Sequence, residues 1–332
     1  MLPQKSPKTG YWKNGDLKFE DVLFRFSRET QKELRDWIKA LPAEKFIEDI
    51  KLSDYSAPNF QKDMEKVREE LETGTRLTIL APVEGLNPLE QGVVSWLAGI
   101  ALGNPLNQAS DPTGKQQMKI YRIFDRGGRL EKGARYSYTN QGGDCHTDNV
   151  NTDDSWQYMI LTSVFSAYAG GGSILVSGLT VHDILEEQYP EVLETLRQPI
   201  LWERKGIRDN TFYEAPVVTY NEKGEPEFRW LPSYVFQSID KAVQMGHPKA
   251  QPMTAEQKHA FDVMTATLAR ADLQFQSDLP EGHALIDYDC QVFHERGHFA
   301  DRKNPYIPDV NERTFDPSKN YGRLRYRMWI KK

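Results

Sequence analysis

Two residues near the middle of the chain, His146 and Asp148, have the types and spacing of a metal-binding pair. In an extended segment, side chains two positions apart project to the same side, so they can occupy adjacent positions on one ion. A histidine from a distant segment would complete a face of two histidines and one carboxylate. That face leaves the opposite side of the ion open, which suits non-haem Fe(II) that must bind a cosubstrate and O2 together. His294 is the candidate for this third ligand.

Other interpretations of these residues are open at this point. A His-x-Asp pair is frequent by chance, and a lone histidine is usually a surface residue or a hydrogen-bonded core residue. The chain has seven histidines, and His298 follows His294 after only four positions. The metal interpretation therefore depends on the features that surround these residues.

Two further features bear on it. Ser173 follows three glycines and opens an apolar run, which indicates a turn and a strand, or a hydroxyl placed near the metal to donate to a carboxylate. Arg323, Arg325 and Arg327 have equal parity on a strand-like segment and therefore share one face. On a solvated face they would be ordinary surface cations. On an inward face, one of them would form a bidentate clamp on a carboxylate.

Composition limits the class of protein. The chain has 332 residues with 27% charged and 39% hydrophobic residues, which is typical of a soluble globular enzyme. Its net charge of −6 argues against nucleic acid or an anionic membrane as a partner. Its only cysteines, Cys145 and Cys290, are too few for a disulfide framework and are expected to be buried thiols. The polar N-terminus lacks the apolar core of a signal peptide, so a cytoplasmic protein with a small-molecule substrate is expected, and a homo-oligomer stays open.

The hydrophobic pattern predicts helices first and short strands later. The first helix is expected at Gln31–Leu41, with Thr30 as its N-cap and Glu33 completing a capping box. The other predicted helices are Pro58–Leu71, Pro88–Leu102, Val181–Gln188, Pro190–Arg197 and the segment from the N-cap Thr254 to Asp272. The predicted strands are Thr75–Ala81, Lys119–Phe124, Tyr158–Tyr168, Ser173–Val176, Thr211–Tyr220, Glu227–Trp230, His283–Asp287 and Tyr326–Ile330. This order favours one sheet-based domain with helical buttresses over alternating βαβ units.

Taken together, these motifs resemble the TauD/TfdA group of Fe(II)- and 2-oxoglutarate-dependent dioxygenases, which includes γ-butyrobetaine hydroxylases. The resemblance covers roughly Lys119 to the C-terminus, and its motifs occur in the family's order. They are His146-Thr147-Asp148, the glycine run that ends at Ser173, the distal Asp289-Cys290-Gln291-Val292-Phe293-His294-Glu295-Arg296, and a late arginine, Arg323. Cys290 and Glu295 depart from the family pattern, which has Asn and Gly there.

The resemblance implies a mainly β fold with flanking helices, a distorted double-stranded β-helix (jelly roll, clavaminate synthase-like). It implies a single catalytic domain over residues 1–332, with a mostly helical part at 1–115 and a jelly-roll core at 116–332. The spacing between His294 and Arg323 is longer than in many relatives, so an insert is expected near 301–319.

The resemblance also implies the site. His146, Asp148 and His294 would bind Fe(II), and 2-oxoglutarate would be the cosubstrate, its far carboxylate held by Arg323 with Ser173. Arg327 is the alternative anchor. O2 would then drive hydroxylation or desaturation with release of succinate and CO2. Halogenation is disfavoured because Asp148 fills the position that a halide needs.

The substrate is less constrained by the sequence. A small polar or zwitterionic metabolite is expected, such as an amino acid, a betaine or an aminophosphonate. Aromatic residues near the metal motif are also ordinary core residues in strands, and the alternatives to an oxygenase are a zinc hydrolase or a non-catalytic jelly-roll binding protein that retains the fold. The candidate substrate-binding residues are Tyr136, Tyr138, Asn140, Asn149, Trp156, Tyr158 and Arg296.

Overall fold

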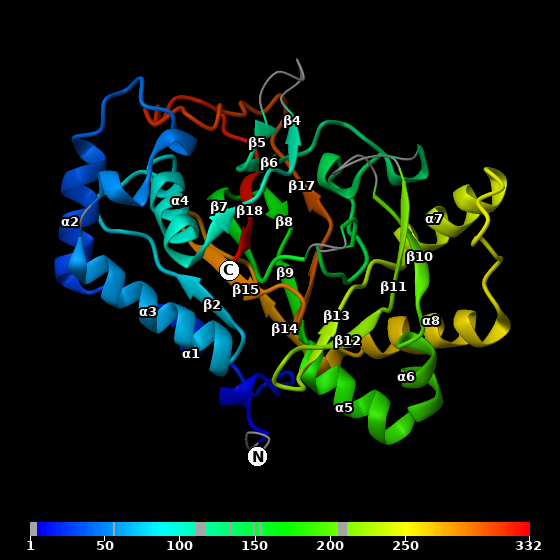
Figure 1. Ribbon diagram of the computed structural model, residues 1–332. Coiled ribbons are helices and arrows are strands. Elements are labelled where there is room, and N and C mark those ends of the chain that lie inside the picture. The colour runs from blue at the N-terminus through cyan, green and yellow to red at the C-terminus, as the bar shows by residue number, and fades with distance from the viewer. Residues whose placement is uncertain are drawn as a thin grey trace.

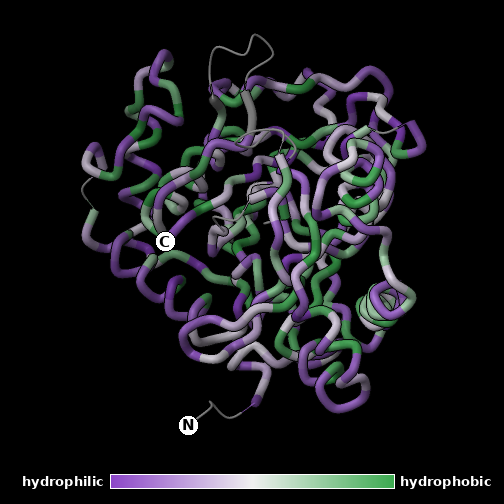
Figure 2. Tube along the Cα trace, turned by 45° about the vertical axis from the view of Figure 1, so that its right-hand side comes forward, coloured by the Kyte–Doolittle hydropathy of each residue, from purple (hydrophilic) through white to green (hydrophobic). Residues whose placement is uncertain are grey.

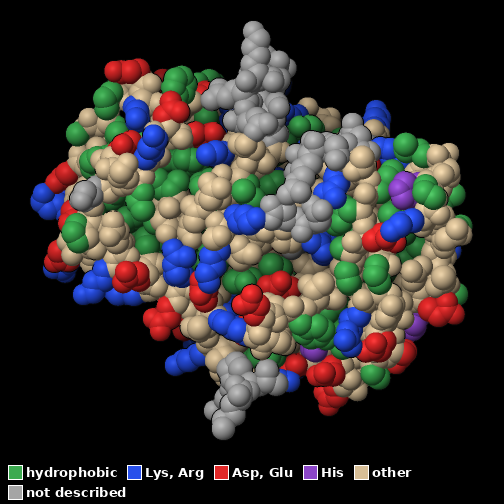
Figure 3. All heavy atoms as spheres, viewed as in Figure 1, with side chains coloured by type: hydrophobic (Ala, Val, Ile, Leu, Met, Phe, Trp, Pro, Cys, Tyr) green, Lys and Arg blue, Asp and Glu red, His purple; other side chains and the backbone are tan. Residues whose placement is uncertain are grey.

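Two β-sheets face each other at the centre of the molecule, and helices cover the outer side of each (Figure 1). The computed structural model describes residues 5–55, 57–110, 117–132, 134–148, 150–152, 155–204 and 211–332. Along most of the trace the hydropathy alternates over short stretches, as expected for elements with one buried face (Figure 2). Basic and acidic side chains are interspersed over the face seen in Figure 3. Among the described residues, no helix has the length and apolar character needed to cross a membrane.

The larger sheet has seven strands. In spatial order they are β1 (Leu23–Phe24), β2 (Leu77–Leu80), β15 (Ala284–Tyr288), β7 (Tyr158–Phe165), β18 (Leu324–Lys331) and β3 (Asn104–Pro105), with β6 (Tyr121–Ile123) also paired to β18. All pairs except β1 with β2 are antiparallel. Neighbours such as β7 and β18 are far apart in sequence, so the sheet joins distant segments of the chain.

The smaller sheet carries the glycine run and the distal histidine. It consists of β14 (Gln274–Ser277), β9 (Ser173–Ser177) and β16 (Val292–Arg296), all antiparallel. Its register places His294 opposite Leu175 and Arg296 opposite Ser173. The remaining described strands form two-stranded pairs: β10 (Ile200–Glu203) with β11 (Phe212–Ala215), β12 (Val218–Tyr220) with β13 (Pro226–Phe228), β8 (Ala169–Gly170) with β17 (Phe299–Ala300), and β4 (Ala109–Ser110) with β5 (Gln117–Met118).

The helices form two separate outer layers. The larger sheet packs on α2 (Arg28–Lys39), α3 (Pro58–Thr73) and α4 (Gln91–Leu102), seen in blue and cyan in Figure 1. The smaller sheet and the pairs β10–β11 and β12–β13 pack on α5 (Gly178–Gln188), α6 (Pro190–Leu196), α7 (Pro232–Gln244) and α8 (Ala255–Leu268). A four-residue helix, α1 (Phe19–Val22), precedes β1. The prediction of a mainly β protein therefore describes only the centre of the molecule.

Most predicted elements are confirmed, with a few corrections. The helix expected from Gln31 begins at Arg28, because Ser27 is its N-cap and accepts the N–H of Thr30. The strand expected over Thr211–Tyr220 is two strands, since Pro216 interrupts the run. Helix α7 was not predicted. The expected insert near 301–319 contains no helix or strand, and its residues Tyr306, Ile307 and Val310 pack on the core beside α2–α4.

Strand β18 shows how the sequence pattern positions the site. Its even-numbered residues Leu324, Tyr326, Met328 and Ile330 belong to the core shared with α2–α4. Its odd-numbered residues Arg325, Arg327 and Trp329 line a cavity on the opposite side. At one end of the space between the sheets, apolar residues of both fill the gap, among them Leu77, Leu175 and Leu285. The other end stays open and forms the cavity.

Candidate metal centre

The cavity between the sheets encloses about 880 Å³ and holds all three predicted metal ligands in its wall. His146 and His294 are brought together by the backbone. Each donates its N–H to the other's carbonyl, at 3.0 and 2.9 Å, which extends the smaller sheet by one bridge. This pairing places the two imidazole rings side by side, with centroids 4.5 Å apart.

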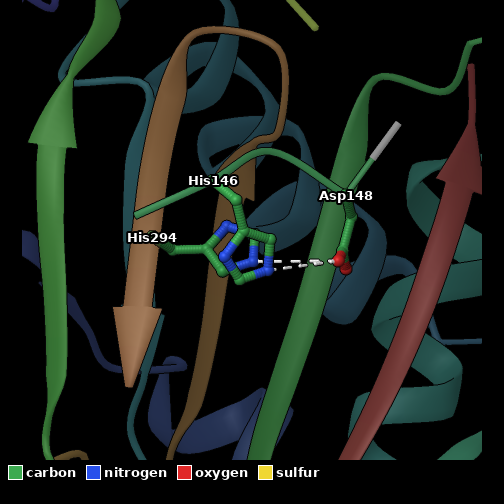
Figure 4. A group of neighbouring side chains, drawn as sticks. All are labelled: His146, Asp148 and His294. Atoms are coloured by element: carbon green, nitrogen blue, oxygen red, sulfur yellow. Dashed lines mark ion pairs between the residues drawn. The ribbon is translucent and has the colours of Figure 1, made fainter. Parts of the chain in front are cut away.

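Asp148 faces both rings (Figure 4). Its Oδ1 lies 3.7 Å from Nε2 of His146 and 3.9 Å from Nε2 of His294. The intervening Thr147 points the other way, and its N–H donates to the carbonyl of Trp230 at 2.8 Å. The His-x-Asp spacing thus places both ligands on one side, as the sequence predicts.

The histidines present their Nε2 atoms to the shared position. Nδ1 of His146 lies 2.7 Å from the carbonyl oxygen of Asp144, so Nδ1 carries the proton and Nε2 keeps its lone pair. Burial lowers the pKa of His146, and burial together with the neighbouring His146 lowers the pKa of His294 to about 3. Both rings are therefore neutral near pH 7, and a metal would not have to displace protons from them.

Asp148 is held ionised by its partners. Its Oδ1 accepts from Nη1 of Arg327 at 3.0 Å, and its Oδ2 accepts from the indole N–H of Trp329 at 2.8 Å. Burial alone would raise the pKa of Asp148, but the Arg327 guanidinium and the hydrogen bond from the Trp329 indole oppose it, and the pKa is lowered. The backbone N–H of Asp148 donates to Oδ1 of Asp289 at 2.9 Å, which fixes the motif to the turn after β15.

This donor set fits one divalent ion. The three ligand atoms lie within 4.8 Å of one another. Bonds of about 2.0–2.2 Å to nitrogen and oxygen place adjacent ligands roughly 3 Å apart, so only a small contraction is required. A second cluster in the described chain, His182 with Asp183 and Glu186, differs because Asp183 pairs with Lys5 and His182 contacts the Tyr220 hydroxyl.

A candidate anion site lies in the wall of the same cavity. The Arg323 side chain is 2% exposed, and its Nε and Nη1 have no hydrogen-bond partner in the described part of the chain. Its Nη2 lies 3.5 Å from the carbonyl of Gly171, and its guanidinium stacks over Phe299 at 4.8 Å. Gly171 has φ +78°, and a Cβ there would lie 3.0 Å from Nε of Arg323, so glycine is required for this approach. Ser173 lines the same cavity.

The other two arginines of the strand have different surroundings. Arg327 donates hydrogen bonds to Asp148 and, at 2.9 Å, to Oε1 of Gln108. Arg325 donates to the carbonyl of Phe165 at 2.7 Å, and burial lowers its pKa to about 10. Burial and the neighbouring Arg325 and Arg296 also lower the pKa of Arg323. Arg323, Arg325 and Arg327 therefore do share an inward face, as their equal parity predicts. Of the three, Arg323 is the one with buried donors that lack a hydrogen-bond partner in the described residues.

Two of the predicted substrate residues line the cavity, Tyr136 and Arg296. The Tyr136 hydroxyl donates to the carbonyl of Arg296 at 2.7 Å and accepts its N–H at 3.0 Å. The ring of Tyr136 lies edge-on to His146, with centroids 5.9 Å apart. The Arg296 guanidinium stacks over Tyr136 and Phe299 and donates to the carbonyls of Thr139 and Gln141.

The structure places the other predicted substrate residues elsewhere. Tyr158 is in the core, since its even position on β7 faces the helices, and its hydroxyl donates to Glu72. Trp156 stacks on Trp329 and so supports the indole that contacts Asp148. Tyr138 stacks with Arg126, and the side-chain carbonyl of Asn140 accepts from Arg129. None of these four lines the cavity. Asn149 lies outside the described residues.

Several residues at the site were not predicted. Gln108 contacts Arg327, Trp329 contacts Asp148, and Ser233, Tyr234 and Gln237 of α7 line the cavity. The parity argument for the arginines of β18 also applies to Trp329 and would have found it. Cys145 and Cys290 are buried free thiols that do not line the cavity.

Comparison with known families identifies the chain. The model of the taurine catabolism dioxygenase TauD, TfdA family matches residues 33–307. The chain belongs to this family. Its members are non-haem Fe(II)- and 2-oxoglutarate-dependent dioxygenases, so the predicted enzyme class is confirmed, with O2 as the other substrate. No curated protein matches the sequence at a significant level.

Solved structures share the fold at low sequence identity. An asparagine oxygenase in complex with Fe(II), 2S,3S-3-hydroxyasparagine and succinate is 11% identical, with a TM-score of 0.65 over 93% of each chain. The non-heme iron oxygenase OrfP in complex with Fe and alpha-ketoglutaric acid is 13% identical, with a TM-score of 0.59 over 93% of this chain and 94% of that one. OrfP with Fe, succinate and (3S)-hydroxy-L-Arg is 11% identical, with a TM-score of 0.61 over the same shares. The described fold is therefore that of these oxygenases.

Proposed function

We propose that this TauD-family dioxygenase binds Fe(II) through His146, Asp148 and His294 and hydroxylates or desaturates a small polar or zwitterionic metabolite. On this proposal its central sheets form a distorted double-stranded β-helix. When bound, the iron supplies the oxidative chemistry that couples decarboxylation of 2-oxoglutarate to attack on a substrate C–H bond, with release of succinate and CO2.

The observation that carries the proposal is that one cavity combines two complementary sites. The Nε2 atoms of His146 and His294 meet Oδ1 of Asp148 in its wall, and Arg323 presents unpartnered donors in the same cavity. Buried cations require anions. A dicarboxylate with one end at the metal and the other at Arg323 and Ser173 satisfies both sites.

The cavity wall favours a substrate with both charged and polar groups. Arg296 and Arg325 add buried positive charge near Arg323, and Tyr234 and Gln237 add hydrogen-bonding groups to the cavity wall. The asparagine oxygenase and OrfP structures contain hydroxylated amino acids. Amino acids are therefore the first class to test, followed by betaines and aminophosphonates, which carry the same combination of charges.

The test measures iron, succinate and product in one preparation. The protein is loaded with Fe(II) without oxygen, bound iron is quantified, and succinate release from 2-oxoglutarate is followed after oxygen is admitted with each candidate substrate. We expect one iron per chain and stimulated succinate release matched by a product that has gained one oxygen atom or lost two hydrogens. Succinate release that does not depend on added Fe(II), or that His146→Ala leaves unchanged, would refute the proposal.

A further inference from the structure

One buried acid beside the metal site has no role in the function described so far. Asp287 lies on β15 between Leu77 of β2 and Met159 of β7, and its side chain is 0% exposed. Within the described chain, neither carboxyl oxygen has a hydrogen-bond donor at normal distance and angle. The backbone N–H of Met159, on the paired strand, interacts favourably with the carboxyl group. Burying an unpartnered carboxyl group is costly whatever its protonation state, so a structural role does not account for it.

The nearest buried group that also lacks a hydrogen-bond partner in the described residues is a ring nitrogen of a proposed metal ligand, on the side that faces away from the metal position. Nδ1 of His294 is buried and has no hydrogen-bond partner in the described residues, and it lies 4.0 Å from Oδ2 of Asp287. Because Nε2 of His294 faces Asp148, the metal-binding tautomer must carry its proton on Nδ1. That N–H requires an acceptor, and the Asp287 carboxyl group requires a donor.

Asp289 is the competing acceptor at this nitrogen. Its Oδ1 also lies 4.0 Å from Nδ1 of His294. The same oxygen already accepts the backbone N–H of Asp148 at 2.9 Å. We therefore assign Asp289 as the acceptor for the backbone N–H of Asp148, and Asp287 as the acceptor for the His294 ring.

We propose that Asp287 is a positioning residue that accepts the Nδ1–H of His294 and holds its Nε2 toward the metal. The inference rests on the proposed metal site. Hydrogen bonds at such sites are often long without ligand and tighten when it binds, and here the ring has to move by about 1 Å. The contact would fix the tautomer and rotation of the ring and raise its basicity. Outer contacts of this kind are typically worth 10- to 100-fold in metal affinity.

The test compares Asp287→Leu, which removes the acceptor, with Asp287→Asn, whose amide oxygen can still accept the N–H. Asp63→Asn is the matched control. Asp63 is also buried, but it accepts from the Ser27 N–H at 2.9 Å and the Thr30 hydroxyl at 2.8 Å, far from the metal site in the fold. Binding of Co(II) to the full chain is titrated through its visible spectrum, and thermal unfolding of each metal-free protein is measured alongside.

We expect Asp287→Leu to weaken Co(II) binding about 10- to 100-fold, with a changed spectrum, and Asp287→Asn to recover most of the affinity. The metal-free Asp287→Leu protein should unfold at the same or a higher temperature, because an unpartnered carboxyl is removed. Asp63→Asn should lower the unfolding temperature and leave Co(II) affinity unchanged. If Asp287→Leu fails to fold, Asp287→Ala is compared with Asp287→Asn in its place.

The outcomes separate this inference from the proposed function. If the wild-type protein binds one Co(II) and Asp287→Leu binds it within twofold, the positioning role is wrong and the metal site stands. Equal losses in the Leu and Asn variants would also overturn it, since the acceptor would then be irrelevant. If the wild-type chain binds neither Co(II) nor Fe(II) stoichiometrically, the proposed function fails and this inference fails with it.

Discussion

Arg323 is the residue whose replacement tests most directly how the cosubstrate is held. Its guanidinium is almost fully buried, with Nε and Nη1 unpartnered in the described chain. A carboxylate of 2-oxoglutarate would take two charge-assisted hydrogen bonds from it in a largely desolvated pocket. Losing such a pair costs about 2–5 kcal/mol. That corresponds to roughly 30- to 4,000-fold in affinity, because about 1.4 kcal/mol is tenfold.

The assay is a titration of 2-oxoglutarate against succinate release at saturating Fe(II). Arg323→Ala should raise the concentration needed for half-maximal rate within that range and leave the Fe(II) requirement almost unchanged. Arg323→Lys should recover only part, since an ammonium group cannot make the two-pronged contact. Metal-free Arg323→Ala should be at least as stable as wild type, because it removes a buried cation that forms no ion pair within the described residues.

Arg327→Ala is the informative comparison. Arg327 donates to Asp148, so its loss should weaken metal binding more than 2-oxoglutarate binding. A large shift in the 2-oxoglutarate requirement for Arg327→Ala with none for Arg323→Ala would reverse the assignment of the two arginines.

Three further predictions concern the metal ligands and their surroundings. His146→Ala should abolish iron-dependent turnover and stoichiometric iron binding while circular dichroism shows an intact fold, and full activity in this variant would remove His146 from the ligand set. Cys145→Ser and Cys290→Ser should each retain one iron per chain by metal analysis, because neither thiol lines the cavity; loss of iron would show that a thiol binds the metal. Trp329→Phe removes the 2.8 Å hydrogen bond to Oδ2 of Asp148 and should lower the free energy of unfolding by about 1–3 kcal/mol in urea titrations; an unchanged midpoint would mean that this contact contributes nothing to stability.

The sequence predicted the residues of the site where local spacing determines which way a side chain points. The two-residue period of an extended chain brings His146 and Asp148 to one side and aligns the arginines of β18. On β7 the same two-residue period turns Tyr158 toward the helices and away from the cavity. Proximity in sequence to the metal motif was therefore a poor guide to substrate contact, and strand parity would have been a better one.

Other features depend on contacts between distant segments and could not be predicted locally. Ser27 is the N-cap of α2 in place of Thr30, whose hydroxyl donates to Asp63 on another helix. Asp287 reads as part of an ordinary strand until the pairing of β15 and the position of His294 are known. Helix α7 is different, because its amphipathic pattern and Pro232 in the first turn are local signals that favour a helix.

Strand β18 connects the two ends of the proposed cosubstrate site. Arg327 and Trp329 donate to Asp148, the proposed metal ligand, and Arg323, just before the strand, is the proposed anchor of the cosubstrate carboxylate. Four residues of extended chain span about 13 Å, and the pairing of β18 with β7 shifts register between Leu324 and Arg325. The separation between the metal and the anion site is thus set by one rigid, centrally paired strand. A change in the register of β18 would alter both sites together, whereas a change in the surrounding loops would leave their spacing intact.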